Sequence, residues 1–180
     1  MDDSFFRYLQ LLEIFAFFTG YPIIYAFVAF LKGNAKSKTT FRNTIFILLP
    51  FAYATVGLLY MGLQLKKLYP DFTLAHITAE IHNPFLTIWG LLSLLFWIPV
   101  LSKKPIISLF HSLVFFFLLV KNFYLQLISA TPDNDFIKNY MRVYSDSIIV
   151  NIGVLFSLLI ISYIIRFIKK KNSVSDKSNI

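Results

Sequence analysis

The chain has 180 residues, of which 57% are hydrophobic and 14% charged, and its formal net charge is +8. A soluble domain of this size has too much surface for its volume to bury so many apolar side chains, which excludes an ordinary globular domain. The chain has no cysteine, so disulfides, thiolate catalysis and cysteine-ligated metals are excluded as well.

Five apolar stretches follow one another along the chain, separated by charged or polar segments. A helix needs about 20 mostly apolar residues to cross the hydrocarbon core of a bilayer. The stretches are unbroken rather than alternating, which is typical of helices and not of barrel strands. We therefore expect an all-α integral membrane protein, with one transmembrane domain at 1–171 and a polar tail at 172–180. The five expected spans are 11–31, 44–65, 85–101, 106–125 and 148–168.

Basic residues gather in the gaps that would lie on one side of the membrane. Eleven of the seventeen lysines and arginines fall between the first and second spans, between the third and fourth, or at and after the end of the fifth. The positive-inside rule then places the N-terminus outside and the C-terminus in the cytoplasm, as an odd number of spans requires. We expect the basic tail to lie against anionic lipid and not to bind nucleic acid.

The connection at 66–84 is longer than a turn and predicts a short helix on the outer surface. Asp71 can accept a hydrogen bond at the start of such a helix and so cap it. Apolar residues then recur at helical spacing, which is typical of an amphipathic helix lying in the interface. These apolar residues are Leu74, Ile77 and Ile81.

The connection at 126–147 predicts a second outer helix. Thr131-Pro132 is suited to a helix start, and the helical pattern continues without a break into the fifth span. We expect its apolar stripe to pack against the first outer helix, so that the two connections form a small helical cap. The stripe consists of Phe136, Ile137, Tyr140, Met141 and Tyr144.

Three ionisable residues within the apolar stretches are candidates for a ligand site or a transport pathway. Glu13 and Lys121 both lie a short distance below the outer ends of their spans. They can form a buried pair between the first and fourth spans, or each can reach the headgroups separately. His111 lies deeper. It can hydrogen-bond a neighbouring helix, or take part in a proton relay or ligand contact.

His76, Glu80 and His82 are of residue types that suit a metal site. His76 and Glu80 are four residues apart and share one helical face, whereas His82 lies off that face. The spacing does not match a zincin motif. We therefore expect these side chains to form the water-exposed face of an interfacial helix. We expect no cofactor.

Glycine and proline residues interrupt several spans. Gly20-Tyr21-Pro22 lies near the middle of the first span. A proline there frees a carbonyl, which can line a cavity or mark a kink. Gly153 and Ser157 in the fifth span are small residues four positions apart, a spacing suited to close contact between helices.

Four short motifs occur in order, LLYMGLQ at 58–64, LYPDF at 68–72, IPV at 98–100 and PIISLFH at 105–111, before a lysine-rich end. Over residues 58–171 this order resembles the EXPERA-domain family, which includes a sterol isomerase and a sterol- and lipid-binding receptor. The positions of the family's ligand-binding acids hold Gly62 and Gly90 here, and only His111 falls on a family position. The resemblance implies a bundle able to hold a lipid-like ligand, without isomerase chemistry.

These features favour a multi-pass membrane protein without a catalytic site, which binds a hydrophobic or lipid-like ligand or serves as an accessory subunit of a membrane complex. One alternative is a small oligomeric transporter or channel that uses the three ionisable residues within the spans. Another is a membrane enzyme with a metal or acid–base site on the outer face. The expected partners are the bilayer, a lipid-like ligand, and further copies or a membrane complex. The chain is rich in phenylalanine and lysine and has no cysteine, which is compatible with an AT-rich bacterial genome. We therefore expect a bacterial inner membrane.

Overall fold

A computed structural model describes residues 3–33, 40–128 and 134–177. Within these ranges the chain is helical and contains no strand, which confirms the expected all-α class. The elements are α1 (Asp3–Phe18), α2 (Tyr21–Gly33), α3 (Thr40–Leu68), α4 (Leu74–Glu80), α5 (Pro84–Leu91), the 3₁₀ helix η1 (Leu92–Trp97), α6 (Pro99–Ser102), α7 (Pro105–Leu127) and α8 (Asn134–Lys177).

Among the described residues, four segments are long and apolar enough to cross a membrane: α1 together with α2, then α3, α7 and α8. They correspond to the first, second, fourth and fifth predicted spans. The segment predicted as the third span is a shorter apolar helix, Pro84–Trp97, formed by α5 and η1. It ends because Ile98 is extended before Pro99, and a proline disfavours helical backbone in the residue that precedes it.

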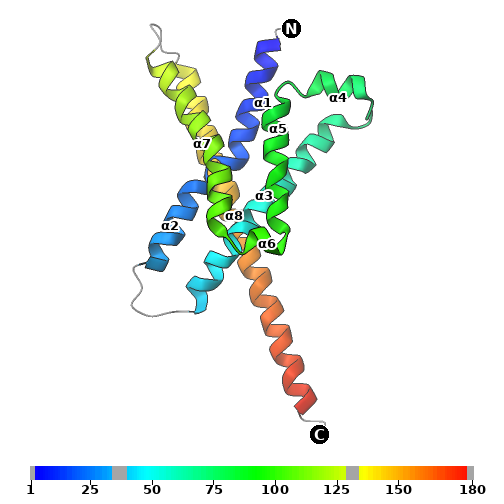
Figure 1. The fold of residues 1–180 in the computed structure, drawn as a ribbon, viewed down its shortest axis with the longest axis vertical. Helices are drawn as coiled ribbons and strands as arrows, with labels where there is room; N and C mark the ends of the chain where they lie inside the picture. Colours follow the sequence, from blue (N-terminus) through cyan, green and yellow to red (C-terminus); the bar gives the residue numbers. More distant parts are fainter. Residues whose placement is uncertain (1–2, 34–39, 129–133, 178–180) are drawn as a thin grey trace.

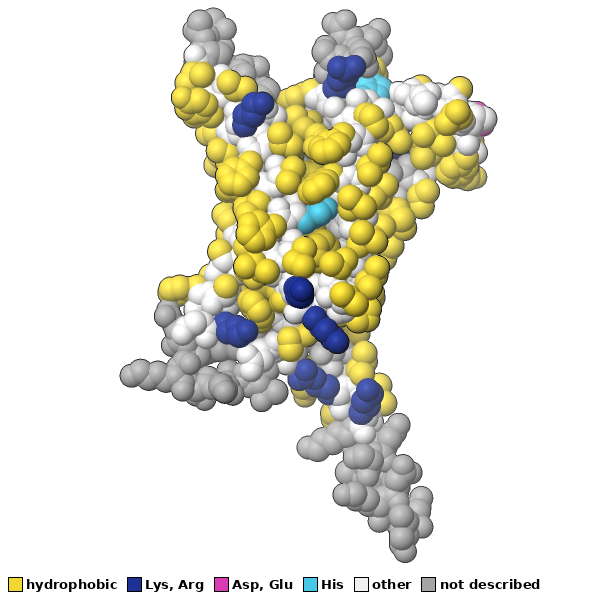
Figure 2. Space-filling model, in the orientation of Figure 1, with side chains coloured by type: hydrophobic (Ala, Val, Ile, Leu, Met, Phe, Trp, Pro, Cys, Tyr) yellow, Lys and Arg dark blue, Asp and Glu magenta, His cyan; other side chains and the backbone are white. Residues whose placement is uncertain are grey.

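The helices run between two ends of the molecule (Figure 1). The start of α1, the helix α4 and the C-terminal end of α7 lie at one end. The C-terminal end of α2, the start of α3 and α6 lie at the other, and α8 projects well beyond them. On the face drawn in Figure 2, hydrophobic side chains cover the middle, and basic side chains gather mainly at the end from which α8 projects. Soluble monomers rarely expose so broad an apolar surface.

The break in the first span is held by two polar side chains of α8. Pro22 has no N–H to continue the helix, and the chain turns at Thr19-Gly20 between α1 and α2. The Gly20 N–H donates to Ser147 Oγ at 2.8 Å, and Asn151 Nδ2 donates to the Phe17 carbonyl at 2.7 Å. Backbone groups exposed by the break therefore have partners within the bundle, as apolar surroundings require.

Gly20 also marks a close backbone contact between the first span and α8. A Cβ added at Gly20 would lie 2.6 Å from the backbone nitrogen of Ile148 and 2.7 Å from the carbonyl carbon of Ser147. Gly153 and Ser157, predicted to make a close helix contact, are exposed on α8, and nothing lies within 4 Å of a Cβ built at Gly153. Within the described chain the close contact lies at Gly20, and a helix contact at Gly153 and Ser157 stays a prediction.

Aromatic side chains fill the interior of the bundle. Phe18 of α1 stacks on Phe115 of α7, with ring centroids 4.8 Å apart. A Cβ added at Gly90 of α5 would lie 3.0 Å from the rings of both Phe18 and Tyr60, whereas Gly62 is exposed on α3. Gly90 is thus covered by aromatic rings, and Gly62 lies on the surface.

Candidate functional site

A cleft of about 420 Å³ lies between α1, the C-terminal end of α3 and α4. We call it the α1–α4 cleft. Its wall is partly apolar and partly charged, a composition that suits a molecule with both kinds of surface. The residues that line it are Phe6, Leu9, Gln10, Glu13, Lys67, Ala79, Glu80 and His82.

Helix α1 supplies half of this lining from one face. Phe6, Leu9, Gln10 and Glu13 are spaced by three, one and three residues, and side chains at such spacing share one side of a helix. The apolar members come first along the chain, and Glu13 lies one turn deeper toward the middle of the molecule. The face that α1 presents to the cleft thus changes from apolar to charged along the helix.

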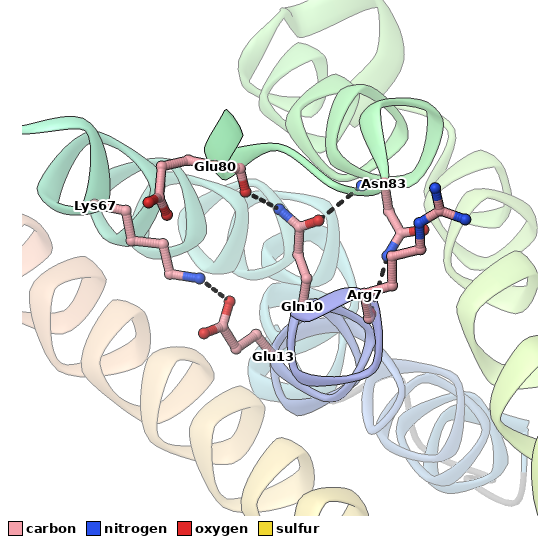
Figure 3. Close-up of polar contacts among 6 residues, drawn as sticks. All are labelled: Arg7, Gln10, Glu13, Lys67, Glu80 and Asn83. Carbon is pink, nitrogen blue, oxygen red and sulfur yellow. Dashed lines mark hydrogen bonds and ion pairs between the residues drawn. The ribbon is translucent and has the colours of Figure 1, made fainter. Parts of the chain in front are cut away.

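At the charged end of this face, Glu13 forms an ion pair with Lys67 (Figure 3). Lys67 lies in the last turn of α3, where a cation interacts favourably with the helix dipole. A carboxylate within an apolar stretch is expensive unless it is paired. The two side chains nevertheless stay 28% and 32% exposed. Each charge is therefore balanced by the other, and both groups remain accessible to a ligand.

Gln10 ties the connection between α4 and α5 to α1 (Figure 3). It is only 4% exposed. Its Nε2 donates to the Glu80 carbonyl at 3.4 Å, and its Oε1 accepts the Asn83 N–H at 2.7 Å. Asn83 Nδ2 in turn donates to the Arg7 carbonyl at 3.0 Å. These bonds hold one wall of the α1–α4 cleft in place.

The short helix predicted at 66–84 is present as α4, but its cap differs from the prediction. Thr73, not Asp71, is the N-cap residue, and its hydroxyl accepts the His76 N–H at 3.4 Å. Asp71 is exposed. Both residue types cap helices well, so residue type alone could not decide between positions two residues apart.

The apolar stripe at the start of α8 does not pack as one face against α4: Tyr140 packs against α1, Tyr144 lies against Phe116 of α7, and Met141 is exposed, while the side chain of Phe136 lies outside the described residues. Tyr140 is buried, and its ring lies 6.2 Å from the rings of both Tyr8 and Phe15 on α1. In Figure 1, α4 and the start of α8 lie on opposite sides of α1. The prediction that α8 continues unbroken into the last span is confirmed, whereas Thr131-Pro132 lies outside the described residues.

The structure separates the two candidates Glu13 and Lys121. Glu13 pairs with Lys67 of α3, a residue that was not among the candidates predicted from the sequence. Lys121 is exposed on α7, beside a groove lined also by Phe117 and Tyr124. Lys67 and Glu13 lie near the same end of consecutive spans, which was the available signal for their pairing.

The potential metal ligands do not form a cluster. Among the described residues, no three His, Asp or Glu side chains come close enough together to hold a metal ion. Glu80 and His82 both line the α1–α4 cleft, and the His82 ring lies 5.4 Å from that of Phe6 at a steep angle. His76 follows the N-cap of α4 and is not part of the cleft lining.

His111 lies in the aromatic interior, away from the α1–α4 cleft. Its Nδ1 and the Tyr53 hydroxyl are 2.7 Å apart. The Trp89 ring stacks on the imidazole with centroids 4.8 Å apart, and Trp89 Nε1 donates to the His111 carbonyl at 3.2 Å. His111 therefore links α7 to α3 and α5. Its partners could not be identified from the sequence, because hydropathy gives no information on which spans are neighbours.

No family model, curated protein or solved structure matches this chain. The function is therefore inferred from the chemistry of the α1–α4 cleft. The cleft offers an ammonium, two carboxylates, an imidazole and an amide close to apolar side chains. Such a set can hold a charged or zwitterionic group by ion pairs and hydrogen bonds while apolar contacts hold an attached hydrocarbon.

Proposed function

We propose that the chain is an integral membrane protein that binds an amphipathic, lipid-like ligand in the α1–α4 cleft, without catalysis. It would cross the membrane five times, with the N-terminus outside and the C-terminus in the cytoplasm. Four segments long and apolar enough to cross a membrane support this, as does the basic end of the molecule. We place it in a bacterial inner membrane, because the phenylalanine- and lysine-rich, cysteine-free composition is compatible with an AT-rich bacterial genome.

Besides the four long segments, this proposal needs one more crossing, which is the third in chain order. It is made by α5 and η1 together with α6. A 3₁₀ helix rises about 2.0 Å per residue against about 1.5 Å for an α-helix, so η1 lengthens a segment of few residues. In Figure 1 this segment extends from the end that carries α4 to the end where α7 begins. The crossing completes an up-and-down order of helices, with α4 as the outer cap.

The proposed function rests on the ion pair of Glu13 and Lys67, whose side chains are both partly exposed. A zwitterionic headgroup fits it, with the anionic part near Lys67 and the cationic part near Glu13 and Glu80. Phe6 and Leu9, which also line the cleft, would contact the apolar part of the same ligand next to its headgroup. Each part of the ligand thereby meets a surface of matching polarity.

Native mass spectrometry of the protein released gently from its own membrane tests this proposal. We expect a defined lipid-like mass on the wild type and an about tenfold lower retained fraction on Lys67→Met, the effect of about 1.4 kcal/mol. Lys66→Met is the matched control, because Lys66 is exposed on the same helix and does not line the cleft. Leu9→Trp, which fills the cleft and keeps its charges, is expected to lower retention as well.

Equal retention by Lys67→Met, Leu9→Trp and the Lys66→Met control would contradict ligand binding in this cleft. A wild type that carries only the mixed lipids of the bulk membrane would contradict it too. The elution profile of each variant in size-exclusion chromatography shows that a lost ligand does not reflect a lost fold.

A further inference from the structure

A second groove, of about 510 Å³, lies at the end of the molecule opposite the α1–α4 cleft. It is formed by the C-terminal end of α2, the first half of α3, α6 and the start of α7. We call it the basic groove. None of the candidate site residues predicted from the sequence lines it.

Two lysines from different elements provide the charge of the basic groove. Lys32 lies in the last turn of α2, with its Nζ 3.9 Å from the centroid of the Phe46 ring. This cation–π contact holds the ammonium against the wall of the groove. Lys103 lies across the groove, after α6, and is exposed. Among the described residues that line the groove there is no acidic side chain, so neither lysine is neutralised within it.

The start of α7 adds to this positive character. Pro105 lines the groove and is the first residue of α7, which has 23 residues. The N-terminal end of a long helix carries a partial positive charge and favours anions. Ser102 also lines the groove, but it is buried and its hydroxyl donates to the Pro99 carbonyl at 3.4 Å. An anion in the groove would therefore meet two ammonium groups and the end of a helix.

The remaining wall of the basic groove is apolar. Ile47 and Phe51 are four residues apart on α3 and share one face, and Ile47 is 59% exposed. This face leads from the lysines toward the hydrophobic middle of the molecule. The order of surfaces, cationic at the end and apolar toward the middle, matches the headgroup and acyl chain of a lipid in that leaflet.

We propose that the basic groove binds an anionic phospholipid, with its phosphate between Lys32 and Lys103 and an acyl chain along Ile47 and Phe51. Charge complementarity selects an anionic over a zwitterionic lipid, because no carboxylate in the groove can hold a cationic headgroup. The inference requires only that the chain lies in a membrane. It does not depend on the ligand of the α1–α4 cleft.

The test titrates the purified full chain, in a neutral detergent, with phosphatidylglycerol or with phosphatidylcholine of the same acyl chains, and counts bound lipids by native mass spectrometry. We expect phosphatidylglycerol to bind at least about tenfold more tightly. Lys32→Gln and Lys103→Gln should each weaken it by about fivefold, the effect of one basic residue near anionic lipid. Lys32→Arg should retain it.

Lys169→Gln is the matched control, because it removes one exposed charge near the basic end of the molecule without touching the groove. If Lys169→Gln weakened phosphatidylglycerol binding as much as the groove variants do, the lipid would be attracted by the overall positive charge and not bound in the groove, and the proposal would be overturned. Equal binding of the two lipids would overturn it as well, as would displacement by millimolar inorganic phosphate. Lys67→Met should leave this binding unchanged, which separates the result from that for the α1–α4 cleft.

Discussion

Gly20→Ala is expected to unfold much of the protein under conditions in which the wild type stays intact. The added Cβ would lie 2.6 Å from a backbone nitrogen of α8 and 2.7 Å from a backbone carbon, neither of which can rotate away. The helices would have to separate, and the bond from the Gly20 N–H to Ser147 would be lost. Overpacking and the lost bond together are expected to cost about 3 kcal/mol or more. The midpoint of unfolding in detergent measures this change.

Gly153→Ala is the control for this prediction, because it makes the same chemical change in a helix with open space around the residue. Alanine is a better helix former than glycine by about 0.5–1 kcal/mol, so this variant should be as stable as the wild type or slightly more so. Opposite signs for the two variants would support the close contact between the first span and α8. A neutral Gly20→Ala would contradict it.

His111→Ala should be the second strongly destabilising change, at about 2–4 kcal/mol. Removal of the imidazole leaves a cavity among the rings of Tyr53, Trp89 and Phe115. It also leaves the Tyr53 hydroxyl, which is buried, without its partner. The unfolding midpoint in detergent should fall, and the emission of Trp89 should change because its stacking partner is gone.

His76→Ala is the control, since His76 lies on the short surface helix α4. It should change stability by no more than about 0.5 kcal/mol. If His111→Ala proved as stable as His76→Ala but released the ligand, His111 would be a ligand contact and not a link between helices. That result would contradict the position assigned to it here.

Hydrophobic length and charge predicted the helical class and the four long segments because both depend on composition over many residues. The same reasoning did not predict the length of the third helix correctly. The sequence is apolar through residue 101, but Pro99 forces Ile98 into extended backbone, so the regular helix ends early. The local signal was present in the sequence, and its effect on the length of the helix was underestimated.

Contacts between helices were harder to predict, because periodicity gives the face of a helix and not its neighbour. Glu13 pairs with Lys67 of α3 and not with Lys121 of α7, although α1 packs against both helices. Similarly, the stripe that includes Tyr140 was recognised as a packing face, but Tyr140 packs against α1 and not against α4. The spacing of small residues did not identify the close helix contact either. Gly153 has the spacing typical of such a contact, but within the described chain the contact is made at Gly20.

The central claim is that the α1–α4 cleft holds an amphipathic ligand, and photocrosslinking in the native membrane tests it most directly. A photoreactive amino acid would replace Ala79, which lines the cleft, or Ile149, which is 66% exposed on α8 away from it. After irradiation, mass analysis of the labelled peptides should show one defined lipid-like adduct at position 79 and a mixture of membrane lipids at position 149. The same mixture at both positions would contradict the account.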